Sequence, residues 1–204
     1  MNTGLQSLTK ALVSNINNIQ RSLVVVRGRR DSAGAGIIWQ KHGIILTNNH
    51  VINGHAPAVL LSHGVELVAE ILARDPEIDL ALLKVEAENL EKACPAQPGQ
   101  ARTGELVFAV GHPWGQRNFV TLGVISSMGE LQTSSGNRRV PVLHTDAHLA
   151  PGNSGGPLLN ASGDVVGINT LIFGGDQGMA IQIQVADEFA NEALGKKASK
   201  DGFF

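Results

Sequence analysis

The sequence predicts an all-β protein made of two lobes, with a helix at each end of the chain. Two observations lead to this fold class. The 204 residues include 24 glycines and only 4% aromatic residues, which is more typical of a chain with many tight turns than of a helical bundle. Short apolar and β-branched runs also recur at close spacing without long helices between them, as in a β-barrel or β-sandwich.

The first expected element is an amphipathic helix. Leucine and isoleucine recur at steps of three and four residues along 5–20, so they form one face of a helix. We expect this helix, within an N-terminal segment 1–21, to pack on the rest of its own domain. Binding of a partner protein by the same face is the alternative.

A first lobe is expected over residues 22–92. Its apolar runs are separated by glycine, Asp-Pro and other turn residues, which indicates strands joined by short turns. The expected strands are 23–26, 37–39, 43–47, 58–61, 65–72 and 80–85. The next segment, 93–102, is polar and contains two prolines, and we interpret it as a linker.

The strand pattern resumes in a second lobe, residues 103–185. The expected strands are 106–110, 119–128, 140–143, 157–159, 165–173 and 178–183. A C-terminal segment, 186–204, contains a predicted helix at 186–194, then Gly195 and a polar, lysine-containing tail. The two predicted β lobes are similar in length.

Composition narrows the possible partners and compartments. The net charge of -2 provides no electrostatic basis for binding nucleic acid. No apolar run is long enough for a membrane span, and the N-terminus lacks the pattern of a secretory signal. We assign no compartment, but expect a cytoplasmic protein unless an export signal has been removed. Cys94 is the only cysteine, so no intramolecular disulfide can form.

The run Gly-Asn-Ser-Gly-Gly at 152–156 is the first candidate for chemistry. Ser154 lies between glycines, where the backbone can turn tightly and leave the hydroxyl uncovered. A serine nucleophile needs an adjacent base and N–H donors for the oxyanion. Such a run is also an ordinary turn sequence, so its interpretation depends on the rest of the chain.

The order of the other candidate residues favours one kind of hydrolase. All seven histidines precede Ser154, whereas an α/β-hydrolase requires a histidine after the serine. The remaining order is His, Asp, Ser, as in chymotrypsin-type enzymes. His50 closes an apolar strand and is the candidate base, with a solvated histidine as the alternative. Asp79, between apolar strand formers, is the candidate acid; Asp75 looks like a turn residue, and Asp146 like a support for the serine loop.

A zinc site is the other chemistry to consider. His42, His50 and His55 are the nearest to a ligand cluster in the sequence. Their spacing matches no usual zinc pattern, and no cysteine lies among them. We therefore expect neither a metal nor another cofactor.

Three motifs, in order, resemble those of the trypsin-like serine proteases, and within them the HtrA/Deg branch. Ile-Leu-Thr-Asn-Asn-His-Val at 45–51 resembles the histidine motif, and Asp-Pro-Glu-Ile-Asp-Leu-Ala-Leu-Leu at 75–83 resembles the aspartate motif. Gly-Asn-Ser-Gly-Gly-Pro-Leu at 152–158 resembles the serine motif. Gly-His-Pro-Trp-Gly at 111–115 is similar to a Gly-Asn-Pro-Phe-Gly turn of that branch. The resemblance extends over about residues 22–194.

The resemblance implies two six-stranded antiparallel β-barrels with the active site between them. It assigns His50 as general base and then acid, Asp79 as its orienting carboxylate and Ser154 as nucleophile. The backbone N–H groups of Gly152 and Ser154 would form the oxyanion hole. The implied function is a serine endopeptidase of protein quality control that cuts unfolded polypeptide through an acyl-enzyme.

The resemblance also suggests where substrate binds. His148 lies near the expected floor of the primary specificity pocket, and the segment 178–184 near its wall. Met179 and Gln182 occupy positions where the branch usually has phenylalanine and proline. The expected substrate-binding residues are His148, Leu149, Ala180, Ile181 and Gln182.

Several departures from the family pattern leave alternatives open. Asn153 stands where digestive trypsins have an aspartate that pairs with a new N-terminus, so we expect no activation by N-terminal cleavage. Activity would depend instead on the order of the loops 131–141, 144–152 and 172–178. The sequence runs to Phe204, and we expect no PDZ domain of the kind usual in the branch. A monomer or a homotrimer is expected, and the alternative function is a peptide-binding or chaperone-like module whose triad is rarely assembled.

Overall fold

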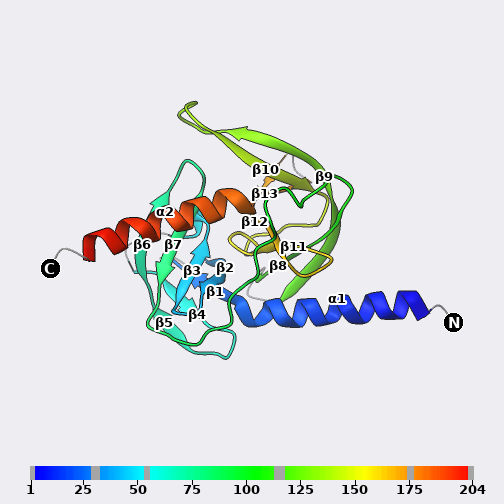
Figure 1. Ribbon diagram of the computed structural model, residues 1–204, viewed down its shortest axis with the longest axis horizontal. Helices are drawn as coiled ribbons and strands as arrows, with labels where there is room; N and C mark the ends of the chain where they lie inside the picture. Colours follow the sequence, from blue (N-terminus) through cyan, green and yellow to red (C-terminus); the bar gives the residue numbers. More distant parts are fainter. Residues whose placement is uncertain (1–2, 29–32, 53–55, 113–117, 174–176, 202–204) are drawn as a thin grey trace.

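The protein is mostly β, with two β lobes and two long helices (Figure 1). The computed structural model describes residues 3–28, 33–52, 56–112, 118–173 and 177–201. Strands β1 to β7 form the first lobe and β8 to β13 the second. Helix α1 (Thr3–Ser22) precedes the first lobe, and α2 (Ile183–Asp201) follows the second.

The first lobe is a seven-stranded antiparallel sheet in the order β5-β4-β1-β2-β3-β7-β6. Its strands are β1 (Leu23–Arg27), β2 (Ala33–Gln40), β3 (Ile44–Thr47), β4 (Ala58–Leu60), β5 (Glu66–Val68), β6 (Glu70–Asp75) and β7 (Leu80–Lys84). The expected closed, six-stranded first barrel is therefore a seven-stranded half-barrel.

The difference arises within one expected strand, 65–72. Only Ala69 separates β5 from β6, and the Ala69 N–H donates to the carbonyl of Pro57 at 2.8 Å. β5 pairs with β4 at one edge of the sheet, whereas β6 pairs with β7 at the other edge. A single bent segment thus supplies both edges of the sheet and curves it toward closure.

The second lobe is a closed barrel in the order β10-β13-β12-β11-β8-β9, as the prediction of a six-stranded barrel required. Its strands are β8 (Leu106–Gly111), β9 (Phe119–Gln132), β10 (Arg139–Thr145), β11 (Pro157–Asn160), β12 (Val165–Phe173) and β13 (Gln177–Gln182). β9 and β10 continue beyond the barrel as a long hairpin at the top of Figure 1.

The two lobes share one apolar core in addition to a smaller core inside each lobe. The shared cluster contains Leu80 of β7, Ile168 of β12, Ile19 of α1 and Ala186 of α2. Burial of this continuous cluster away from water fixes the position of one lobe against the other.

Both helices are longer than predicted. In α1, Leu12, Ile16 and Ile19 pack on the shared core, which confirms for this part of the apolar face that the helix packs on its own domain. The other end of α1 extends past the second lobe (Figure 1). α2 begins at Ile183, earlier than expected, and continues through Gly195. Within the described residues, neither helix has the length and apolar character needed to span a membrane.

Candidate active site

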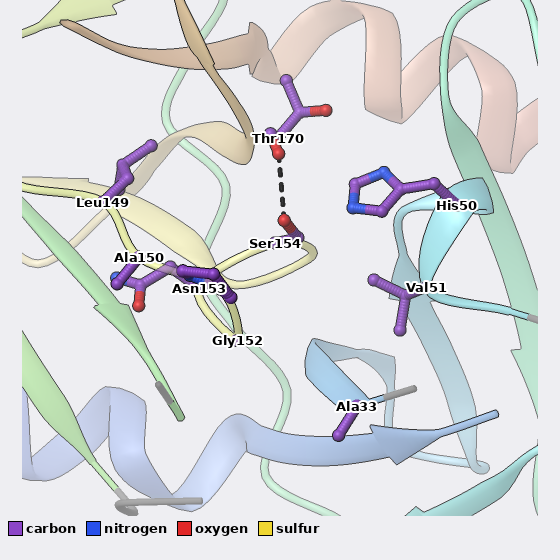
Figure 2. A pocket seen from close by; sticks show the side chains of 10 residues that line it. Ala33, His50, Val51, Leu149, Ala150, Gly152, Asn153, Ser154 and Thr170 are labelled. Carbon is purple, nitrogen blue, oxygen red and sulfur yellow. Dashed lines mark hydrogen bonds between the residues drawn. The ribbon is translucent and has the colours of Figure 1, made fainter. Parts of the chain in front are cut away.

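A cavity of about 340 Å³ lies between the lobes (Figure 2). The first lobe contributes His50 and Val51 to its lining, and the second contributes Ser154 and Thr170. The structure therefore brings the predicted base and the predicted nucleophile, 104 positions apart in the sequence, to the same cavity. Figure 2 shows the imidazole of His50 facing Ser154.

His50 lies on a single turn of 3₁₀ helix, η1 (Asn49–Val51), that follows β3. Val51 is buried, whereas 43% of the His50 side chain is exposed. Arg74 of β6 holds this turn: its Nε donates to Asn49 Oδ1 at 2.7 Å and its Nη2 to the Ile52 carbonyl at 3.0 Å. The turn is thus fixed on both sides while the ring remains accessible.

Asp79 binds His50 through both carboxylate oxygens. Oδ2 lies 2.7 Å from Nδ1 of the ring, and Oδ1 accepts the His50 backbone N–H at 2.9 Å. An ionised carboxylate can only accept, so this contact favours the proton on Nδ1 and leaves Nε2 free to accept another. The structure therefore pairs the predicted acid with the predicted base.

The backbone of Asp79 has an uncommon conformation. Its φ is +54°, in the left-handed region that few residues other than glycine adopt. The Asp79 carbonyl accepts Asn48 Nδ2 at 2.8 Å and the Asn49 N–H at 3.1 Å. These bonds hold the residue in a conformation that aims its carboxylate at the histidine turn.

Thr170 of β12 is a site residue that the sequence reasoning missed. Its hydroxyl donates to Asp79 Oδ2 at 2.6 Å, and its carbonyl accepts the Ser154 hydroxyl at 2.9 Å. Thr170 thus links the carboxylate of the first lobe to the serine of the second. The available signal was the polar pair Asn169 and Thr170, both buried within an otherwise apolar strand.

The hydroxyl of Ser154 is directed at Thr170 in this structure (Figure 2). A hydroxyl has one hydrogen, so it does not donate to His50 in the same arrangement. The hydroxyl hydrogen must turn from the Thr170 carbonyl toward Nε2 of His50 before that nitrogen can take the proton.

One of the two predicted oxyanion donors, the Gly152 N–H, lies in a tight turn, and Ser154 follows that turn. The Asn153 N–H donates to the Ala150 carbonyl at 2.9 Å, with Pro151 and Gly152 between them. A proline followed by Gly152 at φ +106° defines a type II turn. The central peptide is reversed between type I and type II turns, so this class determines where the Gly152 N–H points. The Gly152 carbonyl accepts the His112 N–H at 3.1 Å, which gives the turn a further hydrogen bond.

The serine loop packs directly on the first lobe. The Ser154 carbonyl accepts the Ala35 N–H at 2.8 Å. Gly155 has φ +82°, and a Cβ there would lie 2.2 Å from the Ala35 carbonyl oxygen and 2.4 Å from Thr47 Oγ1. Only glycine allows this approach, which sets the position of Ser154 relative to β2 and β3.

One of the five expected substrate-binding residues lines the cavity. Leu149 does so, whereas the His148 carbonyl accepts the Thr121 hydroxyl at 2.8 Å. Ala180 and Ile181 are buried in cores, and the buried Gln182 donates to the Val142 carbonyl at 3.2 Å. A role for these residues in substrate binding stays a prediction.

Asn153 of the same turn is buried, with 1% of the residue exposed. Neither its Nδ2 nor its Oδ1 has a hydrogen-bond partner among the described residues. A buried polar group left unpaired costs about 1–3 kcal/mol.

The alternative zinc site is not assembled in the described part of the chain. His42 pairs with Glu88 and His50 with Asp79, while His55 lies outside the described residues. No group of three His, Cys, Asp or Glu side chains among the described residues could hold a metal ion. Two other predicted segments lie partly outside the described residues: 113–115 of the Gly-His-Pro-Trp-Gly motif and 174–176 of the loop 172–178.

Comparisons with known proteins agree with this geometry. Residues 34–168 match the model of the trypsin-like peptidase domain. The chain is 41% identical over 173 residues to HhoB of Synechocystis, named as a serine protease, a match covering 82% of this chain and 42% of the relative. It is 42% identical over 167 residues to a DegP-like periplasmic serine endoprotease of Pseudomonas putida (strain GB-1), covering 79% of this chain and 35% of the relative.

Solved structures give the same result. The serine endoprotease from Yersinia pestis superposes with a TM-score of 0.79 and 32% identity, covering 90% of this chain and 66% of the other. The HtrA-type protease AlgW with a tripeptide superposes with a TM-score of 0.80 and 34% identity, covering 87% of this chain and 61% of the other.

The chain spans less than half the length of the two sequence relatives. The family match, residues 34–168, contains eight of the ten residues that line the cavity, and Ala33 and Thr170 lie just outside it. The family match, the sequence identities and the superpositions together show that this chain belongs to the trypsin-like peptidase domains, in the HtrA/DegP family.

Proposed function

We propose that this chain is a serine endopeptidase domain that cuts polypeptide with a triad of His50, Asp79 and Ser154. The observation that carries the proposal is the placement of His50, bound at its Nδ1 by Asp79, on the same cavity as Ser154. Membership of the HtrA/DegP family supports it. The family alone would not say which side chains act.

In the proposed acylation step, Ser154 Oγ attacks the carbonyl carbon of the scissile peptide bond. Its proton passes to Nε2 of His50, and Asp79 stabilises the imidazolium that results. The backbone N–H groups of Gly152 and Ser154 bind the oxyanion. When the intermediate collapses, the C–N bond breaks, the leaving amine takes the proton from His50, and the acyl group remains on Ser154.

Deacylation repeats these roles with water as the nucleophile. His50 takes a proton from the water, whose oxygen attacks the ester carbonyl. The ester C–O bond then breaks, and Ser154 Oγ recovers its proton from His50. The two steps need no group beyond those that line or adjoin the cavity.

Thr170 supports both partners of the proposed triad. Its hydroxyl restrains the Asp79 carboxylate, and its carbonyl holds the Ser154 hydroxyl in the resting state. Entry of a substrate would draw the Ser154 hydroxyl away from Thr170 toward His50. The cost of breaking this hydrogen bond would be part of the barrier to acylation.

The proposed substrate is an unfolded polypeptide, in keeping with a role in protein quality control. The cavity is open and lined by Leu149, Ala150 and Pro151 beside the serine, so an extended chain with an apolar side chain would fit its chemistry. AlgW, a solved HtrA-type relative, holds a tripeptide.

A second candidate is a peptide-binding or chaperone-like module with a rarely assembled triad. The hydrogen bond of Ser154 to the Thr170 carbonyl favours it, because this bond directs the hydroxyl hydrogen away from the base. Such a module would bind unfolded polypeptide and leave it uncut.

The two candidates are separated by incubating the protein with reduced, denatured casein and analysing fragments by mass spectrometry and binding by fluorescence anisotropy. The endopeptidase predicts fragments with wild type and with the surface control Ser127→Ala, and bound but uncut casein with Ser154→Ala. Binding without cleavage by the wild type supports the second candidate. Absence of both contradicts each of them.

A further inference from the structure

The tip of the β9–β10 hairpin, residues 133–138, belongs to the second lobe but reaches the first. Arg138 Nη1 lies 2.6 Å from Asp75 Oδ2, and the Ser135 hydroxyl donates to Glu77 Oε2 at 2.6 Å. Asp75 ends β6, and Glu77 follows it in the turn to β7. These two contacts join the lobes at a point outside the cavity lining.

Internal hydrogen bonds hold the hairpin tip in one shape. The Thr133 N–H donates to the Arg138 carbonyl at 3.0 Å, and the Gly136 N–H donates to the Thr133 carbonyl at 2.8 Å. The Asn137 N–H donates to Ser135 Oγ at 3.3 Å. Ser135 and Arg138 therefore extend from a closed turn rather than from a loose loop, so their contacts can restrain what they touch.

Ser135 and Arg138 contact the turn that precedes Asp79, the proposed catalytic carboxylate. Asp75 Oδ1 accepts the Glu77 N–H at 2.9 Å, which closes the turn. Ile78 is buried in the shared core, and the next residue is Asp79 with its φ of +54°. A residue in this unfavourable region keeps its conformation only where the surrounding structure holds it.

The charges at this contact strengthen it. Partial burial raises the pKa of Asp75, but the hydrogen bond from Arg138 and the N–H groups of Glu77 and Ile78 outweigh it and lower the pKa below its usual value. The hydrogen bond from Ser135 likewise lowers the pKa of Glu77. Both carboxylates are therefore ionised at neutral pH and accept from the hairpin tip.

We propose that the hairpin tip is a clamp that positions Asp79, with Arg138 and Ser135 as its positioning residues. By holding Asp75 and Glu77, the tip keeps the turn before Asp79 in the shape that aims the carboxylate at His50. Neither residue touches substrate. The inference rests on the proposed function, because it assigns these contacts a role in the triad.

The first test is Arg138→Gln, assayed by steady-state cleavage of an unfolded substrate. We expect kcat to fall about tenfold, since small displacements of catalytic groups are costly, and KM to change less than about twofold. Arg138→Lys restores the charge and should recover part of the loss. The matched control is Arg139→Gln, which removes the same charge one residue away, where Arg139 contacts Glu130 of its own hairpin.

A second readout depends on the triad but not on substrate binding: the rate at which a fluorophosphonate modifies Ser154. It should fall in Arg138→Gln and in Ser135→Ala but not in Arg139→Gln. In an Asp75→Asn background, the further effect of Arg138→Gln should be small, because its partner charge is already removed. Assays are run well below the unfolding midpoint of each variant, and Ser135→Ala replaces Arg138→Gln if the latter does not fold.

The outcomes separate the two proposals. If wild type neither cleaves nor reacts with the probe, the proposed function fails, and the clamp fails with it. If wild type is active and Arg138→Gln matches Arg139→Gln in kcat and in labelling rate, the clamp alone is overturned. A lower melting temperature in Arg138→Gln with unchanged kcat also overturns it, since the contact would then be purely structural.

Discussion

Three donors converge on the carboxylate of Asp79: the ring Nδ1 and the backbone N–H of His50, and the hydroxyl of Thr170. The first two come from the first lobe and the third from the second. The carboxylate is thus held from both sides of the cavity. Its orientation depends on the packing of the lobes as well as on local sequence.

Thr170→Val tests this arrangement at a single atom. The substitution keeps the side-chain shape and the backbone carbonyl but removes the donor to Asp79. A hydrogen bond to a charged group is worth about 1.5–3 kcal/mol, so we expect kcat to fall about 10- to 100-fold. Steady-state kinetics measures the change, with the exposed Thr103→Val as control. Equal kcat in the two variants would contradict a role for the hydroxyl.

At the residue scale, the sequence identified side chains whose neighbours carry a motif. His50, Asp79 and Ser154 each lie in a recognisable run, and their order excluded the α/β-hydrolase arrangement. Thr170 has no such run. A polar residue in a strand can face solvent, core or cavity, and only the pairing of β12 with its neighbours decides which.

At the scale of elements, the serine loop has its shape because glycines allow it to approach β2 and β3. Asp79 and Ser154 are both carried on tight turns that end in buried strands, β7 and β11. Rigid strands therefore position two otherwise exposed turns. This is how short segments from different lobes keep a constant geometry.

Gly155→Ala tests the fit of the serine loop. The added methyl group would meet the carbonyl oxygen of Ala35 at 2.2 Å in a backbone conformation with φ +82°. Because neither backbone can yield cheaply, we expect the free energy of unfolding to fall by about 3 kcal/mol or more. Urea denaturation measures it. Gly195→Ala is the control, since nothing lies within 4 Å of a Cβ there; similar stability of both variants would contradict the argument.

The hairpin contact predicts a pH dependence with a definite sign. The pKa of Asp75 is lowered in the folded state, so the contact stabilises the protein above the unfolded pKa of about 4, and this contribution is lost as the pH falls through the folded value. Thermal unfolding should therefore separate wild type from Arg138→Gln at pH 7, and the two should converge on acidification. A difference that grows toward low pH would contradict the assignment.

Some element boundaries could not be predicted because they depend on distant partners. The division of 65–72 at Ala69 follows from the pairing of β5 with β4 and of β6 with β7, and no local signal marks it. The start of α2 at Ile183, before the predicted start at residue 186, also depends on distant partners, because Ile183 is buried in the shared core. The six strands of the second lobe, by contrast, were visible in the apolar runs.

At the scale of the whole molecule, the two lobes are joined by packing that they share. α2 contacts β7 of the first lobe as well as β12 and β13 of the second. The shared core therefore holds His50 and Asp79 at a fixed position relative to Ser154. Loss of this packing should affect activity as well as stability.

Ala190→Asp tests this coupling. Ala190 is fully buried in the shared core, and an unpaired charge placed there should lower the free energy of unfolding by about 3 kcal/mol or more. We expect one unfolding transition, monitored by circular dichroism, that shifts to lower temperature and is accompanied by loss of cleavage over the same range. Gly195→Asp, which adds the same charge at an exposed position of α2 where nothing lies within 4 Å of a Cβ, is the control. Two separate transitions, one for each lobe, would contradict a shared core.

The central claim is that His50 and Asp79 activate Ser154, and the most direct measurement is covalent labelling with a fluorophosphonate, located by tandem mass spectrometry. We predict one adduct per chain, on Ser154, with no adduct in Ser154→Ala and labelling slowed by several orders of magnitude in His50→Ala. An adduct on another residue, or equal labelling rates in wild type and His50→Ala, would contradict the account.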